Sequence, residues 1–386
     1  MIATLAVENY RSLRNLVLEL GQLTVITGAN GTGKSSLYRA LRLLADSARN
    51  GAVAALAREG GLQSALWAGP ETIGKAVRAG EHPVQGTVRQ RPVALRLGLA
   101  TNDLGYAIDF GLPQPSSSAF QLDPLVKREA VWAGPVLRPA TLLVERIGTT
   151  LRIRDGRSWS TLPDMIGPFD SMLSEYTDPH RAPELLKLRE QIRSWRFYDQ
   201  IRTDAAAPAR QVRIGTRTPV LSHDGADLAA ALQTIREIGD EAALDAAIDA
   251  AFPDSKLEIG IEGARLEVRL RQHGLLRPLG VAELSDGTLR YLLWTAALLA
   301  PRPPALLVLN EPETSLHPEL IRPLSRLIAV GAERTQIVVV SHSRPLIDAL
   351  AHDAEPTRIE LVKDFGETQV EGRDRFDRPA WQWPKR

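Results

Sequence analysis

Cysteine is absent from this sequence of 386 residues, which excludes several classes of chemistry. The chain cannot form disulfides, hold zinc through thiolates, ligate an iron–sulfur cluster with cysteine or use a cysteine nucleophile. A strong net charge is missing as well, because 47 basic and 46 acidic residues leave a formal charge of +1. No global basic field points to nucleic acid, so any DNA site must be a local patch.

Long apolar segments are also lacking. The N-terminus, "MIATLAVENYRSLRNL", has no basic stretch followed by an apolar run and is therefore not a signal peptide. The most apolar helix-like run, Tyr291–Ala300, is about half of the ~20 residues that span a bilayer. We therefore expect a cytoplasmic protein that does not interact with membranes. No long heptad repeat occurs either, which excludes a long coiled coil.

Hydrophobic periodicity predicts an α/β protein. Alternating residues indicate paired strands near the N-terminus, and "LTVITG" indicates an apolar strand that ends at glycine. Towards the C-terminus, "ALLVLN" and "TQIVVV" are apolar without alternation, which is typical of parallel strands buried on both faces. The segment from Pro168 to Phe252 is mostly helical. Further strands are expected in 2–10, 16–20, 84–110, 142–156 and 256–272.

The loop "GANGTGKS" matches the pattern G-x-x-x-x-G-K-[ST] at Gly28, Gly33, Lys34 and Ser35. In such a loop, glycines let backbone N–H groups curl around phosphates, the lysine meets the β/γ oxygens and the serine hydroxyl ligates Mg²⁺. A glycine-rich loop can match by chance. Here it lies between a predicted strand and a predicted helix, which is the context that a phosphate-binding loop requires. The sequence therefore predicts a site for ATP and Mg²⁺.

Polar residues also follow two later apolar segments. Glu311 comes after the strand "ALLVLN", where ligands bind in open α/β sheets, and is suited to accept a proton from an attacking water. A cap or surface turn is the alternative. "LSDGT" opens a long helix, so Ser285 could bind an anion or act as a plain N-cap. His342 ends the strand "IVVVSHS" and, taken alone, could be no more than a polar terminus.

In this order, "NYRSL", "GANGTGKSS", "LSDGT", "LLVLNEPETSLHP" and "VVVSHS" resemble the ABC-type head ATPases of the RecF, SMC and OLD group. The sequence is most similar to bacterial AAA-family (OLD-like) ATPases without a Toprim nuclease domain. The matching motifs cover residues 1–45 and 280–350. The resemblance implies a composite head from 1–150 and 255–386, with a mostly parallel sheet and an antiparallel β lobe. Residues 151–254 would form an inserted, mainly helical lobe without a long coiled coil.

The resemblance also implies residue roles. Two heads would dimerise around ATP, with Ser285 and Gly287 contacting the γ-phosphate bound to the partner subunit. Lys34, Glu311 and His342 would be catalytic, Glu311 by polarising water and His342 by sensing the γ-phosphate. The "SLHP" turn at 315–318 would be the D-loop at the dimer seam. The residues expected to contact nucleotide are Arg11, Gly28, Asn30, Gly31, Gly33, Lys34, Ser35, Ser36, Ser285 and Gly287.

The sequence departs from the family pattern at the metal site and the signature. "LSDGT" replaces LSGG, a variant similar to the OLD branch, and Glu129 is our candidate by position for the missing Q-loop glutamine. Asn310 stands where Walker B has Asp. Asn keeps an oxygen acceptor but loses the charge; Mg²⁺ usually retains waters, so an outer-sphere amide is tolerated. We expect Ser35, Asn310 and Glu129 to form a weakened metal site in a slow ATPase. A switch without turnover is the alternative.

Two readings of the biological role remain open. In the first, the ATPase acts on or near DNA in repair or phage defence, as the family suggests. In the second, it is a nucleotide-gated module that recruits or restrains a separate effector or nuclease. Residues 343–386 are too few for a Toprim domain. The candidate DNA contacts, which could equally be solvated basic side chains, are Lys187, Arg189, Arg193, Trp195 and Arg196, and Arg210, Arg213 and Arg217. The tail "DRPAWQWPKR" could pack its tryptophans on the head or dock a partner.

Overall fold

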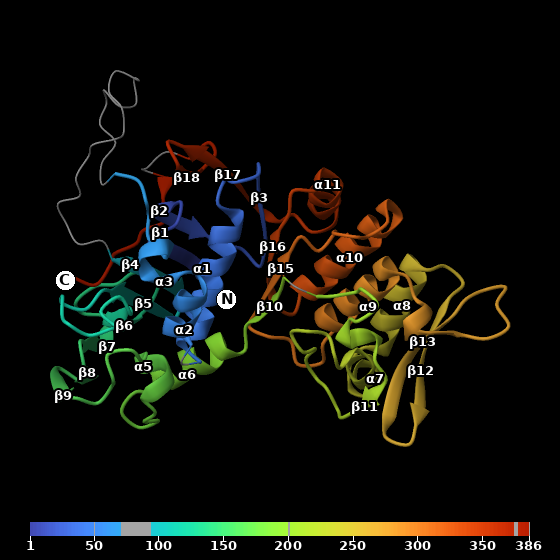
Figure 1. The fold of residues 1–386 in the computed structure, drawn as a ribbon, viewed down its shortest axis with the longest axis horizontal. Coiled ribbons are helices and arrows are strands. Elements are labelled where there is room, and N and C mark those ends of the chain that lie inside the picture. Colours follow the sequence, from blue (N-terminus) through green and yellow to red (C-terminus); the bar gives the residue numbers. More distant parts are fainter. Residues whose placement is uncertain (50, 71–93, 200, 374–376, 386) are drawn as a thin grey trace. The chain divides into compact units, whose positions relative to one another are not determined.

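The structure is a computed structural model that describes residues 1–49, 51–70, 94–199, 201–373 and 377–385. The chain forms two compact units, each assembled from separate segments (Figure 1). Unit 1 comprises Met1–Gly21, Thr27–Ser194 and Ile359–Arg386, and unit 2 comprises Gln22–Ile26 and Trp195–Arg358. The chain passes from unit 2 into unit 1 inside a single strand, immediately before the glycine loop.

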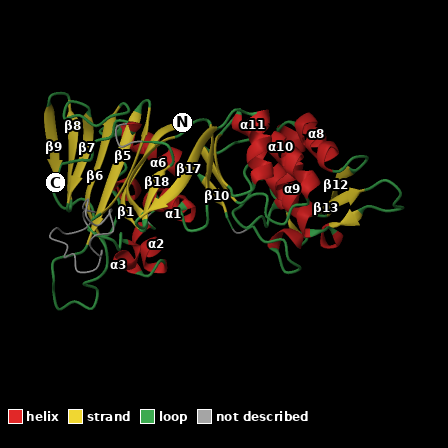
Figure 2. Cartoon of the chain, turned by 90° about the horizontal axis from the view of Figure 1, so that it is seen from above, coloured by secondary structure: helices red, strands yellow, loops and turns green. Residues whose placement is uncertain are grey.

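Unit 1 is built on an antiparallel sheet of eight strands in the order β2-β1-β4-β5-β6-β7-β8-β9, which lie side by side in Figure 2. Its later hairpins are tight, because Gly148 and Gly156 adopt positive φ in the loops that connect β7 to β8 and β8 to β9. The strands are β1 (Ile2–Tyr10), β2 (Leu13–Glu19), β4 (Leu95–Thr101), β5 (Leu104–Gly111), β6 (Leu125–Ala133), β7 (Leu142–Ile147), β8 (Thr150–Asp155) and β9 (Ser158–Leu162).

Helices and a short hairpin complete unit 1. Helix α1 buries the leucines that the sequence places at helical spacing, among them Leu37, Leu41 and Leu44. The helices are α1 (Lys34–Ser47), α2 (Ala52–Arg58), α3 (Gly61–Ala65), α5 (Met172–Glu175) and α6 (Pro183–Arg193). The hairpin pairs β17 (Thr357–Asp364) with β18 (Glu367–Val370) from Leu361 onward.

The C-terminal tail packs on unit 1. The ring of Trp381 lies edge-on to Trp132, with the centroids 5.5 Å apart, and Trp383 contacts Trp381 at 5.2 Å. Gly98 in β4 makes room for this packing, since a Cβ there would lie 2.3 Å from the Trp381 ring. The expectation that the tail packs its tryptophans on the head is confirmed.

Unit 2 contains parallel strands in the order β10-β15-β16-β3. They are β10 (Arg196–Tyr198), β15 (Leu306–Asn310), β16 (Gln336–Val340) and the first residues of β3 (Leu23–Gly28). Every residue of β16 is buried. This confirms the prediction that the apolar segments without alternation are parallel strands covered on both faces.

Helices pack around these strands in one hydrophobic core that includes the middle of α9. They are α7 (Leu228–Ile238), α8 (Glu241–Ala251), α9 (Asp286–Leu298), α10 (Ile321–Ala332) and α11 (Arg344–Asp353). A small antiparallel sheet also belongs to unit 2 (Figure 2). It consists of β11 (Arg213–Ile214), β12 (Lys256–Glu262), β13 (Arg265–Arg271) and β14 (Leu279–Gly280). The 3₁₀ turns in the described part of unit 2 are η1 (Pro208–Arg210), η2 (Val281–Glu283) and η3 (Pro318–Leu320).

The division of the chain differs from the one that we predicted. Residues 151–162 are not helical, because β8 and β9 extend the antiparallel sheet of unit 1. The remainder of 151–254 is shared between the units, with the division at Ser194 and Trp195. The first part of the strand segment expected at 84–110 lies outside the described residues, and β4 begins at Leu95. Among the described helices, none is long and apolar enough to cross a membrane.

Candidate nucleotide-binding site

The glycine loop joins the end of β3 to the start of α1, as the sequence predicts. Gly28, Gly31 and Gly33 all have positive φ, at 140°, 81° and 110°, which side chains with a Cβ rarely adopt. Two of them also face close neighbours within unit 1. A Cβ on Gly28 would lie 2.3 Å from the Leu361 carbonyl oxygen, and one on Gly33 would collide with the Thr368 hydroxyl. The tertiary contacts therefore require glycine here independently of any phosphate.

Lys34 folds back over the loop. Its Nζ donates to the carbonyl oxygens of Gly28 at 2.5 Å and Ala29 at 3.1 Å, and the residue is only 8% exposed. Asn30 and Ser35 are exposed on the same loop. Gly33 is the N-cap of α1 and provides no side-chain cap, so the first N–H groups of this helix are available to an anion. These residues fit the triphosphate and metal of Mg²⁺-ATP.

A residue of the β17–β18 hairpin braces the glycine loop. Thr368 Oγ1 hydrogen-bonds to the Thr32 carbonyl at 2.6 Å and to the Ser12 hydroxyl at 2.8 Å. The Thr368 backbone N–H donates to the Ser12 carbonyl at 2.8 Å. Thr368, which lies near the C-terminus, therefore supports the glycine loop through hydrogen bonds. No pattern in the sequence indicated this contact.

In unit 2, the carboxyl ends of the parallel strands lie in one row. Asn310 of β15 is in register with Val340 of β16, and Val340 with Ile26 of β3. Two backbone hydrogen bonds extend this row, from Glu311 N–H to the Val340 carbonyl at 2.8 Å and from Ser341 N–H to the Ile26 carbonyl at 3.1 Å. Gly28 follows Ile26 by two residues, so the chain continues from this row along β3 into the glycine loop.

The two predicted catalytic residues of unit 2 are in contact. Glu311 Oε1 lies 3.3 Å from His342 Nδ1, and both side chains remain partly exposed at 41% and 56%. Glu311 has a φ of 48°, in the left-handed region that costs a non-glycine residue on the order of 1–3 kcal/mol. This backbone turn directs the carboxylate at the strand end towards the loop that follows β16.

The turn after Glu311 is held by further hydrogen bonds. Trp294 Nε1 of α9 donates to the Pro312 carbonyl at 2.9 Å, and Ser341 Oγ donates to Glu313 Oε1 at 2.5 Å. Ser341 Oγ also accepts from the Ser343 N–H at 3.0 Å. The loops after β15 and β16 are therefore linked twice, through Glu311–His342 and through Glu313–Ser341.

The signature and D-loop segments lie together in unit 2. Ser285 caps α9 by accepting from the Thr288 N–H at 3.1 Å. A Cβ on Gly287 would lie 3.0 Å from the Ser315 carbonyl oxygen, so glycine allows the first turn of α9 to approach the D-loop. A cleft of about 570 Å³ is lined by both segments, and Phe252 forms part of its wall.

Arg210 anchors the segment before the signature helix. Its Nη1 donates to the carbonyl oxygens of Val281 at 3.0 Å and Leu284 at 2.8 Å, and its Nη2 donates to Asp286 Oδ1 at 2.7 Å. Its Nε donates to the Thr203 carbonyl at 2.8 Å. The side chain is only 9% exposed. Arg210, which the sequence suggested as a DNA contact, is instead a structural partner of the signature segment.

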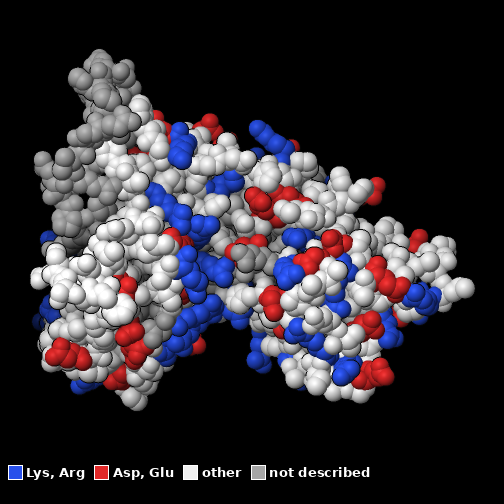
Figure 3. All heavy atoms as spheres, in the orientation of Figure 1, with Lys and Arg blue, Asp and Glu red and all other residues white. Residues whose placement is uncertain are grey.

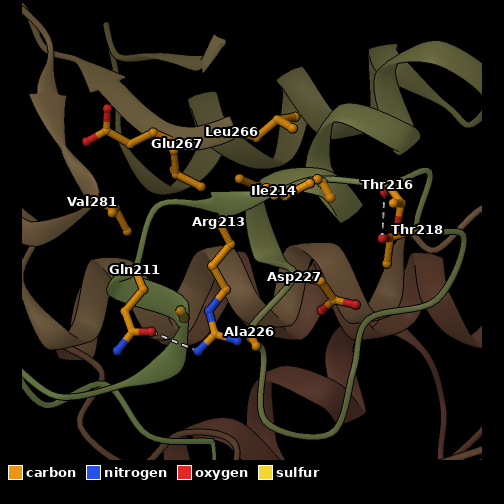
Figure 4. Close-up of a pocket in the computed structure, with 15 residues that line it drawn as sticks. Gln211, Arg213, Ile214, Thr216, Thr218, Ala226, Asp227, Leu266, Glu267 and Val281 are labelled. Atoms are coloured by element: carbon orange, nitrogen blue, oxygen red, sulfur yellow. Dashed lines mark hydrogen bonds between the residues drawn. The ribbon is translucent and has the colours of Figure 1, made fainter. Parts of the chain in front are cut away.

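The other candidate DNA contacts are also largely engaged. Trp195 is 1% exposed, so it offers no stacking surface, and Arg189 is nearly buried and donates to Thr177 Oγ1 at 2.7 Å. Arg217 pairs with Glu237 at 3.4 Å. Arg213 is exposed and donates to Gln211 beside a pocket of about 220 Å³ (Figure 4). Neither predicted group presents its basic residues together as one open patch.

Two further predicted site residues have partners within unit 1. Arg11 has a φ of 50° and its guanidinium pairs with Glu59 at 2.9 Å; Glu59 also accepts from the Tyr10 hydroxyl, whose pKa is raised by burial and by this contact. Glu129 is fully buried in β6. Its Oε1 accepts from Tyr106 and Ser171, and its Oε2 accepts from Arg146 and the Met172 N–H. These donors occupy both oxygens, so we do not retain Glu129 as a metal ligand.

Comparison with solved structures identifies the fold. The structure described as the "SmcHead bound to the C-winged helix domain of ScpA" matches with a TM-score of 0.50 and 13% sequence identity, covering 96% of each chain. The SMC head domain from Thermotoga maritima gives a TM-score of 0.49, also at 13% identity, over 96% of this chain and 97% of that one. At such identity the first match establishes an SMC head-like fold and nothing about activity.

A family model gives the second comparison. No curated protein matches the sequence significantly. The family described as "AAA domain, putative AbiEii toxin, Type IV TA system" matches residues 23–349, which include the glycine loop, the signature helix, Glu311 and His342. Because this match covers most of the chain, the protein belongs to this family of AAA-domain, ABC/SMC-head-like ATPases.

Proposed function

We propose that this protein binds Mg²⁺-ATP at the glycine loop and hydrolyses it slowly to ADP and phosphate. One observation carries the proposal. Glu311 and His342 are in contact at the carboxyl edge of the parallel strands, and β3 of that sheet continues directly into the glycine loop. Ligands of open α/β sheets bind at this edge.

Each residue has a chemical task in this proposal. Lys34 would exchange its loop carbonyls for the β/γ-phosphate oxygens, and Glu311 would accept the proton of the attacking water. His342 would donate to the γ-phosphate while Glu311 fixes its orientation from the other ring nitrogen. Ser35 and, through water, Asn310 would hold Mg²⁺, which neutralises phosphate charge when bound. Among the described residues, no group of three or more His, Asp or Glu is placed to hold a metal ion.

The test is phosphate release by the purified protein with Mg²⁺-ATP. We expect slow turnover that disappears in Lys34→Ala and in Glu311→Gln. Glu333→Gln is the matched control, since Glu333 is an exposed glutamate of unit 2 at the C-terminal end of α10 and should leave the rate unchanged. Absence of release above the Lys34→Ala background, with ATP still bound, would instead identify a nucleotide-binding switch.

We further propose that two heads dimerise around ATP. The signature cleft supports this, because Ser285 and the N-terminus of α9 line it together with the D-loop and present hydrogen-bond donors to an anion. In a dimer, that anion would be the γ-phosphate on the partner subunit. Light scattering of Glu311→Gln with ATP should report a dimer that Ser285→Arg prevents.

For the DNA partner, we propose a surface of unit 1 that differs from the two predicted groups. Arg39 and Arg42 lie on one exposed face of α1, Arg49 is exposed just beyond the end of that helix, and Arg58 of α2 is 73% exposed. Lys and Arg side chains gather over α1 and α2 on the face shown in Figure 3. The same view of unit 2 shows basic and acidic side chains intermingled. A strip of arginines fits a phosphate backbone.

The alternative is a module that gates a separate effector protein. The family description, which names a toxin of a toxin–antitoxin system, favours a protein partner of this kind. The SmcHead structure likewise contains a domain of another protein, ScpA. Turnover that rises with double-stranded DNA would support the DNA reading, and turnover indifferent to DNA would support the effector reading.

A further inference from the structure

Asn310 leaves the carboxyl edge of the sheet without the negative charge that Mg²⁺ prefers. The residue ends β15 in register with Val340, and its amide can offer only a neutral oxygen. Glu311 carries a charge, but that carboxylate contacts His342 and serves as the base in the proposed reaction. Either the site works without this negative charge, or another carboxylate supplies the charge.

Glu313 is a second carboxylate, besides Glu311, that contacts a residue of this edge. Its Oε1 accepts from the Ser341 hydroxyl at 2.5 Å. Ser341 directly follows Val340 of the strand-end row, and its own N–H bonds to the carbonyl of Ile26, the last residue of unit 2 before the glycine loop. Through Ser341, Glu313 is thus tied to the ends of both β16 and β3.

The second oxygen of this carboxylate is unpaired in the part of the chain that the structure describes. Glu313 Oε2 is shielded from solvent and accepts no hydrogen bond from any described residue. A buried charged oxygen without a donor costs free energy, which a cation or its water can recover. In contrast, the carboxylate of Glu129, also buried, is fully saturated by donors within unit 1. We therefore interpret the unpaired oxygen of Glu313 as a group that can accept a hydrogen bond from a ligand, whereas the hydrogen bonds of Glu129 are already complete.

We propose that Glu313 supplies the negative charge that Asn310 lacks, as an outer-sphere partner of the Mg²⁺ that accompanies ATP. This inference rests on the proposed nucleotide site and adds a residue to it. The metal would keep its water shell, as Mg²⁺ usually does, and Glu313 Oε2 would accept from one of these waters. Substituting Walker B Asp by Asn is then tolerated because the charge sits three residues further along the chain.

The test measures metal dependence of binding, independently of turnover. A fluorescent, non-hydrolysable ATP analogue is titrated in EDTA and at increasing Mg²⁺. We expect Glu313→Gln to raise the Mg²⁺ concentration for half-maximal binding by at least about tenfold, the usual cost of losing outer-shell support. Binding in EDTA should not change, because the glycine loop is untouched. Glu333→Gln, at an exposed glutamate of unit 2 at the C-terminal end of α10, is the control for removing one carboxylate.

Asn310→Asp completes the experiment as a double-mutant cycle. If Glu313 provides the missing charge, Asn310→Asp should lower the Mg²⁺ concentration for half-maximal binding strongly in the Glu313→Gln background. The same substitution should lower that concentration less in the wild type. An equal decrease of that Mg²⁺ concentration in both backgrounds would overturn the inference. Loss of analogue binding in EDTA by Glu313→Gln would also overturn it, because Glu313 would then stabilise the fold. Mg²⁺-dependent binding that Glu313→Gln leaves unaltered would refute the inference alone. A wild type that binds no analogue would refute the proposed function as well.

Discussion

Arg210 and Asp286 are joined by a short ion pair, with Nη2 2.7 Å from Oδ1, at the start of the signature helix. The same guanidinium bonds the Val281 and Leu284 carbonyls, so a single side chain fixes the approach to Ser285. A guanidinium presents five N–H donors in a fixed plane, whereas a lysine ammonium presents three at the end of a flexible chain.

Arg210→Ala should therefore weaken both the fold and the proposed dimer. Leaving the carbonyl oxygens without donors costs about 1–3 kcal/mol of unfolding free energy. Freeing Ser285 should weaken ATP-dependent dimerisation roughly tenfold, which corresponds to ~1.4 kcal/mol. Denaturant melts and light scattering measure the two effects, and Arg210→Lys should fall between Ala and wild type. Arg213→Ala, on an exposed arginine of the same segment, should change neither; equal effects of the two alanine variants would contradict the assignment.

Gly287→Ala should separate stability from function. Alanine in a helical turn is favoured over glycine by about 1 kcal/mol, so thermal stability should be maintained or rise. The new Cβ would meet the Ser315 carbonyl oxygen at 3.0 Å and displace the D-loop, so dimerisation and turnover should fall. Calorimetry and phosphate release report the two effects. Gly51→Ala, whose Cβ would make only ordinary contacts, is the control. Undiminished turnover would show that the D-loop position does not matter.

Thr368→Val should loosen the glycine loop without changing side-chain shape. It removes the hydroxyl that bonds the Thr32 carbonyl and Ser12. Loss of one such bond is worth about 1 kcal/mol, so ATP affinity should fall roughly fivefold. Fluorescence titration with an ATP analogue measures the change. Thr161→Val, an exposed threonine of β9, should have no effect. Wild-type affinity in Thr368→Val would mean that the hairpin does not support the loop.

Charge reversal of Arg39, Arg42 and Arg58 should weaken DNA binding if the α1 surface contacts phosphates. Each lost phosphate contact should reduce the slope of log affinity against log salt by about 0.9 for duplex DNA. Anisotropy of labelled DNA at several salt concentrations measures that slope. Arg213→Glu combined with Arg217→Glu is the comparison on unit 2. Loss of binding in that variant alone would return the DNA site to the segment first indicated by the sequence.

The local elements could be read from the sequence because their signals are local. The glycine loop lies between a strand and a helix as predicted, and the apolar runs around Val308 and Val338 form parallel strands. Glu311 and His342 could be expected to meet, since the carboxyl ends of neighbouring parallel strands share an edge. The predicted domain boundary was wrong because β8 and β9 continue a sheet whose extent depends on long-range strand pairing.

The basic side chains show where local signals fail. Helical spacing and composition placed Arg189, Trp195 and Arg210 among exposed DNA contacts. Their burial depends on which segments pack against them, and that information is not present within any short window of sequence. The same reason hides Glu129, which a strand pattern cannot distinguish from an accessible ligand.

By itself, the sequence indicated the glycine loop and the class of fold, because spacing and apolar periodicity specify strands, helices and tight loops; the family resemblance added Glu311 and His342 as candidate catalytic residues. Only the tertiary structure decided which side chains support these groups. Thr368 bonds Thr32, Arg210 bonds Asp286, and the free oxygen of Glu313 lies buried through its contact with Ser341. Hydrogen bonds of this kind join residues far apart in the chain or on neighbouring loops, and they form only when the strands and helices that carry them have packed.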